Sequence, residues 1–145
     1  MAPERTLVLR TDGAARGNPG PAAAGVVIER LDGSPLAREA VFLGELTNNQ
    51  AEYRALILGL RAVAAYKPEA VRVYMDSELV VRQMTGEYQV NNAALRPLYD
   101  EAQALARALP RVTFAHVPRG RNAEADALAN AALDEHARSD TASQR

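Results

Sequence analysis

Cysteine is absent from this 145-residue chain, and histidine occurs only twice. Without cysteine the protein can form no disulfide bond, use no catalytic thiolate and build no zinc site from thiolates. Two histidines also leave little for a histidine-rich metal site. Any metal site would therefore depend on oxygen ligands, which favour magnesium or manganese over zinc.

Long apolar runs are also missing. No segment approaches the roughly 18 uninterrupted apolar residues of a membrane-spanning helix, and the first residues lack the apolar core of a signal peptide. We therefore expect a cytoplasmic protein with no membrane contact. The length and an apolar fraction of 48% fit one globular domain. We expect this domain to cover residues 1–138, to be monomeric and to be followed by a polar tail, 139–145.

Positive charge is not in excess, because the formal net charge is −1. Lys67 is the single lysine among 17 basic residues, and the others are arginine. A near-neutral total excludes an overall basic coat for nucleic acid, but it leaves a local basic patch open.

The apolar pattern predicts an α/β domain that begins with three strands. Residues 5–12 read as a strand that ends at Asp12, and the glycine- and proline-rich segment 13–21 reads as a loop. Two further strands, 22–33 and 34–46, are predicted to meet at a tight turn formed by Asp32 and Gly33.

Helices dominate the rest of the chain. Thr47 and Gln50 form a capping-box pattern, which predicts a helix from Thr47 to about Tyr66. The later elements are predicted in this order: a strand at 70–76, helices at 77–86 and 91–109, a strand at 111–117 and a helix at 123–137. This order favours a five-stranded mixed sheet, antiparallel over the first three strands and parallel afterwards, with helices on both faces.

Four carboxylates adjoin these apolar elements. Asp12 and Asp76 end predicted strands, and Glu52 and Asp126 lie in first helical turns in line with apolar stripes. Taken singly, each also fits an ordinary turn, cap or helix-dipole role. Isolated carboxylates are costly to bury, so four that converge at one edge of the sheet would need a compensating cation.

Such a cluster suits chemistry on phosphate esters. Two divalent ions about 4 Å apart can activate a water and stabilise the attacking and leaving oxygens of a phosphodiester. Four bare acids would instead repel one another and the phosphate. We therefore expect metal-dependent chemistry on a phosphate-rich substrate.

Four segments together are specific enough to indicate a family. They are TDGAARGNPGPAAAGVVI (11–28), TNNQAEYRALILGL (47–60), VYMDSELVVRQMTG (73–86) and NAEADALANAAL (122–133). In these segments and in their order the chain resembles type 1 ribonuclease H. The resemblance implies a ribonuclease-H-like fold and an endonuclease that cuts the RNA strand of RNA/DNA hybrids by two-metal hydrolysis, leaving a 3′-hydroxyl and a 5′-phosphate. It places two Mg²⁺ ions, which Mn²⁺ can replace, on the acids Asp12, Glu52, Asp76 and Asp126.

The same resemblance implies which residues meet the substrate. Those expected to contact the minor groove and backbone of the hybrid are Gly13, Asn18, Thr47, Asn48, Asn49, Ser77, Glu78 and Arg121. An asparagine amide can donate to and accept from the 2′-hydroxyls that distinguish RNA from DNA. Turn and cap roles would also explain the three asparagines.

The chain departs from the best-known members of that family in two segments. Their basic, tryptophan-containing protrusion corresponds here to residues 85–97, which contain no lysine and no tryptophan. Hybrid affinity is therefore expected either to be lower or to depend on arginines elsewhere, such as Arg10, Arg16, Arg82, Arg119 and Arg121. The loop before the last helix carries arginine instead of their flexible histidine. Arg119 or Arg121 could steady phosphate charge or aid the departure of metal and product, but neither could shuttle protons. Of the two, Arg119 is the residue predicted to act in catalysis.

Two alternatives remain. One is a related nuclease or transposase of the same fold, with broader substrates that include double-stranded RNA; transposases usually bear three acids and extra DNA-binding segments. The other is a non-catalytic nucleic-acid-binding module, which would be expected to have lost at least one acid, whereas all four are present. Neither histidine is expected to act in catalysis. His116 is expected to pack within its strand, and His136 is expected to face solvent near the end of the last helix.

Overall fold

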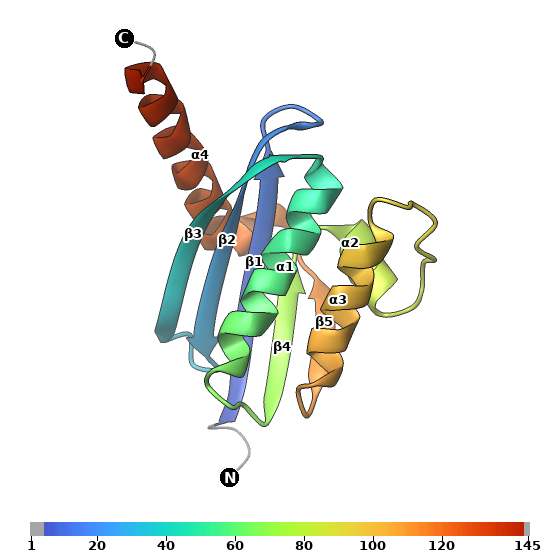
Figure 1. Ribbon diagram of the computed structural model, residues 1–145. Coiled ribbons are helices and arrows are strands. Elements are labelled where there is room, and N and C mark those ends of the chain that lie inside the picture. The colour runs from blue at the N-terminus through green and yellow to red at the C-terminus, as the bar shows by residue number, and fades with distance from the viewer. Residues whose placement is uncertain (1–4, 144–145) are drawn as a thin grey trace.

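The computed structural model describes residues 5–143, and its strands form one sheet in the order β3-β2-β1-β4-β5 (Figure 1). The strands are β1 (Thr6–Ala15), β2 (Gly20–Arg30), β3 (Pro35–Leu46), β4 (Ala70–Met75) and β5 (Val112–His116). The helices are α1 (Asn48–Ala64), α2 (Glu78–Met84), α3 (Arg96–Arg107) and α4 (Ala123–Ser143), with a short 3-10 helix, η2 (Arg119–Asn122), before α4. The predicted α/β fold with a five-stranded sheet is confirmed.

The sheet is mixed as predicted. β1 pairs antiparallel with β2 and parallel with β4, while β3 pairs antiparallel with β2 and β5 pairs parallel with β4. The ladder between β1 and β4 ends at Arg10, whereas the ladder between β1 and β2 continues to Ala15. Asp12 therefore does not end its strand, and the predicted loop 13–21 shrinks to residues 16–19. Backbone pairing with β2 maintains this small-residue stretch as a strand without any apolar alternation.

Helices cover both faces of the sheet, as Figure 1 shows. α1 packs on β1 and β2 with α3 beside it, and α4 packs on β1, β2 and β3 from the opposite face. The main apolar core lies between the sheet and α1 and includes Leu9, Ile28 and Leu56. Tyr53 of α1 is fully buried in this layer, where its hydroxyl donates a hydrogen bond to Gln83 Oε1 at 2.6 Å.

Two helix boundaries differ from the prediction. α3 begins at Arg96 rather than at residue 91, because the Asn92 side chain accepts hydrogen bonds from the backbone of Ala94 and Leu95 and forms a turn there. α4 continues to Ser143, so the predicted helix end at residue 137 is wrong. Residues 144 and 145 of the predicted polar tail, 139–145, lie outside the described residues. Over residues 5–143, no helix has both the length and the hydropathy that crossing a bilayer requires.

Candidate active site

Four different elements carry the four acids. Asp12 lies on β1, just past the end of the ladder with β4, and Asp76 follows β4 directly. Asp126 lies in the first turn of α4, as predicted. Glu52 is in α1 but not in its first turn, which contains no acid. One carboxylate therefore comes from each of four places: the end of β4, the second half of β1, and the N-terminal parts of α1 and α4.

The acids converge on one cleft. Carboxylate oxygens of Asp12, Glu52 and Asp76 lie within 4.8 Å of one another, a group that could hold a metal ion. Asp126 is not part of this tight group, but it lies within hydrogen-bonding reach of Asp12. All four line a cleft of about 530 Å³. The convergence expected from the sequence is therefore present, with three acids in close contact and the fourth beside them.

Two glycines allow α1 and α4 to approach the sheet closely enough for this convergence. A Cβ atom on Gly13 would lie 2.2 Å from the backbone of Ala51, and a Cβ atom on Gly25 would lie 1.9 Å from the carbonyl oxygen of Ala125. Gly25 pairs with Asp12 across β1 and β2. Any larger residue at either position would push a helix, together with its acid, away from Asp12.

The carboxylates are held by few protein groups. Glu52 Oε1 accepts a hydrogen bond from the backbone N–H of Gly13 at 2.9 Å. Arg119 Nε lies 3.8 Å from Asp76 Oδ2, and the arginine side chain is 83% exposed. Within the described residues, Asp76 Oδ1 is buried without a hydrogen-bond partner. A buried acceptor left without a donor is unusual and marks a position where a further group belongs.

Electrostatics in the cleft favour a bound cation. Burial, reinforced by the charges of Glu52 and Asp76, raises the pKa of Asp12 from 3.8 to about 9. Burial likewise raises the pKa of Glu52 from 4.5 to about 8, although its hydrogen bond from Gly13 opposes the rise. Positive charge placed between these oxygens would reverse both shifts. Oxygen donors, the unpartnered Asp76 oxygen and the raised pKa values together fit a hard divalent cation.

The residues predicted to meet substrate divide into two groups. Gly13, Asn48 and Asn49 line the cleft, whereas Asn18, Thr47, Ser77, Glu78 and Arg121 are outside its lining. Thr47 completes the predicted capping box of α1, and Ser77 accepts from Val80 N as the N-cap of α2. Asn18 is tied to the cleft indirectly, because its Oδ1 accepts from the backbone N–H of Asn48 at 3.0 Å.

The cleft lining also contains residues that the sequence argument did not select, namely Ala14, Ala15 and Asn130. Asn130 lies one helical turn after Asp126 and faces the same side of α4, so helix periodicity would have been enough to find it. The two alanines contribute backbone at the end of β1, where side-chain patterns carry no signal.

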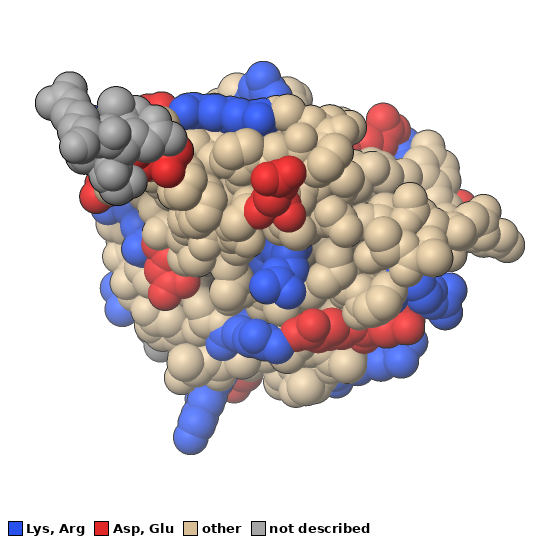
Figure 2. Space-filling model, turned by 45° about the horizontal axis from the view of Figure 1, so that its top comes forward, with Lys and Arg blue, Asp and Glu red and all other residues tan. Residues whose placement is uncertain are grey.

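Most of the arginines proposed to hold nucleic acid are engaged within the protein. Arg10 pairs with Glu29, and Arg16 pairs with Asp134. Arg82 pairs with Glu78 and also with Glu87. In Figure 2, acidic and basic side chains are interspersed among uncharged ones, and the face shown has no broad basic surface.

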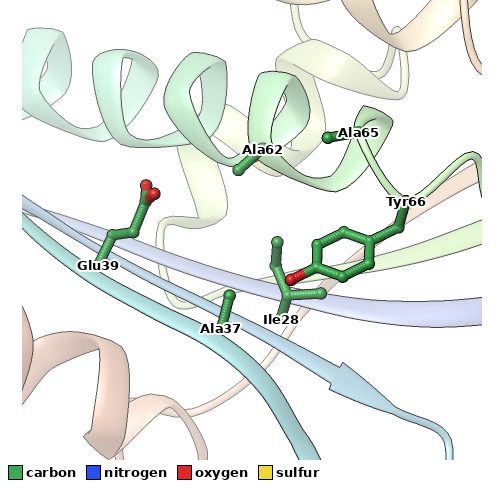
Figure 3. A pocket seen from close by; sticks show the side chains of 6 residues that line it. All are labelled: Ile28, Ala37, Glu39, Ala62, Ala65 and Tyr66. Atoms are coloured by element: carbon green, nitrogen blue, oxygen red, sulfur yellow. The ribbon is translucent and has the colours of Figure 1, made fainter.

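An apolar pocket on another part of the surface lacks this chemistry. The pocket in Figure 3, of about 310 Å³, lies between the β2–β3 edge and the end of α1. Glu39 is its one charged side chain, and the rest of its lining is Ile28, Ala37, Ala62, Ala65 and Tyr66. Titratable groups gather in the carboxylate cleft and not here.

Comparison with known proteins agrees with the geometry of the cleft. The family model described as "Reverse transcriptase-like" matches residues 10–132. Ribonuclease HI of Halobacterium salinarum is 45% identical over 124 residues, which are 86% of this chain and 62% of that protein. The bifunctional protein Rv2228c of Mycobacterium tuberculosis is 46% identical over 134 residues, 92% of this chain and 37% of that protein. The chain therefore spans less than two thirds of the length of these relatives.

Solved structures are similar over nearly the whole fold. The crystal structure of RNase H1 from Halobacterium salinarum has a TM-score of 0.87 at 43% identity and covers 90% of this chain and 98% of its own. LC11-RNase H1 from compost, solved in complex with an RNA/DNA hybrid, has a TM-score of 0.87 at 41% identity with the same coverage. Fold, cleft and sequence similarity lead to one conclusion: this chain belongs to the type 1 ribonuclease H family.

Proposed function

We propose that this protein hydrolyses the RNA strand of RNA/DNA hybrids endonucleolytically and leaves 3′-hydroxyl and 5′-phosphate ends. The observation that carries the proposal is the carboxylate cleft, where oxygens of three acids lie within 4.8 Å of one another and a fourth acid lines the same space. The family is metal-dependent, and relatives named ribonuclease H support the same activity. A neighbour at 41% identity is solved with an RNA/DNA hybrid, which supports the substrate class.

Asp12, Glu52, Asp76 and Asp126 would hold two Mg²⁺ ions, with Mn²⁺ as a substitute. When bound, the ions would supply an activated water and neutralise charge on the scissile phosphate. The protein fixes the ligands beforehand: the Gly13 N–H orients Glu52, and the close packing at Gly13 and Gly25 sets where α1 and α4 stand. No side chain needs to act as the nucleophile.

Arg119 is the cationic side chain of the cleft lining. Its guanidinium lies beside Asp76 and is largely exposed, so it can swing toward a phosphate oxygen. Because it stays protonated, it would stabilise charge on the phosphate or help product depart. We expect Arg119→Ala to lower kcat about tenfold or more with little change in hybrid affinity. Arg121→Ala is the matched variant, and it should weaken binding more than it lowers kcat.

Measured kcat and Kd for the two variants separate these roles. A slow Arg119→Ala enzyme with wild-type affinity supports the assignment. Undiminished kcat in Arg119→Ala would remove Arg119 from the mechanism.

Recognition of the RNA strand would depend on the asparagines near the cleft. Asn48 Oδ1 accepts from Ala15 N at 3.1 Å, and Asn18 Oδ1 accepts from Asn48 N. Both amide groups therefore present N–H donors outward, and a 2′-hydroxyl would serve them as an acceptor. Asn49, Thr47, Ser77, Glu78 and the backbone of Gly13 would complete the contact along the minor groove and backbone.

Weak electrostatic attraction is a further consequence of the proposal. With Arg10, Arg16 and Arg82 engaged in ion pairs, and with Arg119 assigned to charge that develops during cleavage, phosphate contacts in the bound complex would be made by Arg121 among the candidate arginines. Each phosphate contact adds about one unit to the slope of log K against log salt. We expect a slope magnitude of about one for hybrid binding.

The test is cleavage of end-labelled substrates in Mg²⁺ and, separately, in Mn²⁺. RNA/DNA hybrid, double-stranded RNA and single-stranded RNA of one sequence are compared, and the product ends are identified by ligation and phosphatase treatment. We expect the hybrid to be cut and single-stranded RNA to stay intact. An intact hybrid in both metals would leave only the non-catalytic binding module, whereas equal cutting of double-stranded RNA would assign the broader nuclease.

A further inference from the structure

Asp126 differs from the other acids in how it is placed. Oxygens of Asp12, Glu52 and Asp76 lie within 4.8 Å of one another, whereas Asp126 is outside that group. Asp126 sits in the first turn of α4, a long helix that packs on β1, β2 and β3. Its carboxylate lies within reach of Asp12 on β1 and of Asn130 on α4.

Asn130 contacts Asp126 from the next turn of α4. Its Nδ2 donates to the backbone oxygen of Asp126 at 3.0 Å and to Asp126 Oδ1 at 3.3 Å. The amide thus contacts one carboxylate oxygen of Asp126, a residue that lines the cleft beside Asp12. This contact works only if the amide nitrogen, and not the amide oxygen, points at Asp126.

Arg16 enforces that orientation. Arg16 Nη2 lies 3.4 Å from Asn130 Oδ1 and 3.5 Å from the Asn130 backbone oxygen, and it pairs with Asp134 Oδ1 at 2.7 Å. A guanidinium can only donate, so Asn130 must turn its oxygen toward Arg16 and its nitrogen toward Asp126. Asp134, one turn further along α4, holds the guanidinium in this position.

The same arginine ties a substrate-facing loop to α4. Arg16 begins the loop 16–19, which closes through a hydrogen bond from Arg16 N to Pro21 O at 2.8 Å. This loop also carries Asn18, whose side chain caps the backbone of Asn48 beside the cleft. One short loop therefore connects the N-terminus of α1 with the residue that orients Asp126.

We propose that Arg16 and Asn130 are positioning residues that set the metal-binding geometry of Asp126 and link it to the loop carrying Asn18. The inference rests on the proposed function of the cleft as a metal site. It assigns Arg16 to this task rather than to holding nucleic acid. Groups that orient a metal ligand commonly change metal affinity by 10–100-fold when they are removed.

The experiment measures Mn²⁺ affinity without substrate, by electron paramagnetic resonance of the free ion. Variants are Asn130→Ala, Arg16→Met and Arg16→Lys. Arg61→Met is the matched control, because it removes another exposed arginine ion pair, with Glu101, away from the cleft. We expect Mn²⁺ affinity to fall about tenfold or more in Asn130→Ala and several-fold in Arg16→Met, with partial rescue by lysine and no change in Arg61→Met.

The free energy of unfolding, measured in EDTA, shows whether Arg16 and Asn130 position Asp126 or only stabilise the fold. The Arg16–Asp134 pair is exposed, with side chains 44% and 54% accessible, so its loss should lower stability no more than the control does. Unchanged Mn²⁺ affinity in both Asn130→Ala and Arg16→Met would overturn the proposal. A fall in Mn²⁺ affinity that is matched by an equal fall in the free energy of unfolding without metal would also overturn it. Hybrid cleavage by the wild type is recorded separately, so failure of the proposed function would be recognised independently of the affinity result.

Discussion

Replacing Asp12 with asparagine should stabilise the metal-free protein at neutral pH while it removes the activity. The variant keeps the shape of the side chain and has an N–H that can donate to Asp126, and it needs no bound proton to stay uncharged beside Glu52 and Asp76. The wild-type carboxylate is 4% exposed and has no cation to offset its burial when metal is removed. Stability and function should therefore move in opposite directions at this one position.

The magnitude follows from the shifted titration. Because the pKa of Asp12 rises from 3.8 to about 9, the folded protein keeps a proton that the unfolded chain releases above about pH 4. The free energy of unfolding therefore falls as pH rises through this window, by about 1.4 kcal/mol per unit and up to about 4 kcal/mol by pH 7. Asparagine has no such dependence. Because part of the charge repulsion acts on Glu52 and remains in the variant, we expect the free energy of unfolding of Asp12→Asn to exceed that of the wild type by about 2–4 kcal/mol at pH 7 and by almost nothing at pH 4.

Urea unfolding followed by circular dichroism in EDTA, at pH 4 and pH 7, measures this difference. Asp32→Asn is the control, because its exposed carboxylate has a pKa lowered by hydrogen bonds from Ser34 and so has the opposite sign. Added Mn²⁺ should stabilise the wild type more than Asp12→Asn and so reduce the gap. If Asp12→Asn were no more stable than the wild type at pH 7 without metal, the buried, charge-crowded cleft described here would be refuted.

Three further predictions concern packing and capping. Gly25→Ala should lower the free energy of unfolding by about 3 kcal/mol or more and abolish cleavage, because its Cβ would collide with the backbone of α4. The control Gly120→Ala has open space around the added Cβ and should change stability little. Equal chemical-denaturation midpoints for Gly25→Ala and Gly120→Ala would contradict this prediction. Tyr53→Phe should cost about 1–2 kcal/mol in the same assay, since Gln83 Oε1 loses its buried donor, and a neutral result would mean that water replaces it. Thr47→Ala should lower the free energy of unfolding by about 1 kcal/mol, because α1 loses its side-chain N-cap, and Thr47→Ser should restore most of that stability.

Local signals in the sequence were sufficient for most of the fold. The capping box at Thr47 and the turn at Asp32–Gly33 both form as predicted, with Gly33 at a φ of +89°. The end of β1 was predicted wrongly because residues 13–15 are held by pairing with β2, and pairing partners are not visible in a single segment. The last helix was predicted too short because a polar composition at residues 139–143 does not by itself end a helix.

The four acids were selected from predicted strand ends and helix starts, which gather at one edge of an α/β sheet, and the resemblance to type 1 ribonuclease H supported the same set. The predicted positions of Asp12 and Glu52 on their elements were wrong, although both residues line the cleft.

Contacts between distant segments were not predictable in the same way. Arg16 and Asp134 are far apart in sequence, and neither pattern nor spacing relates them. The two histidines show the same limit. His116 is exposed on an edge strand, so the expectation that it packs was wrong. His136 is half-buried and stacks on Phe42 with ring centroids 3.8 Å apart, a contact between distant segments that was not predicted.

The most direct test of the central claim is the rate of RNA-strand cleavage in a defined RNA/DNA hybrid as Mg²⁺ is titrated, for the wild type and for Asp12→Asn. The carboxylate cleft predicts no cleavage in EDTA, a rate that rises with Mg²⁺ in the wild type, and a loss of several orders of magnitude in a folded Asp12→Asn protein. Cleavage by Asp12→Asn at the wild-type rate, or wild-type cleavage that persists in EDTA, would contradict it.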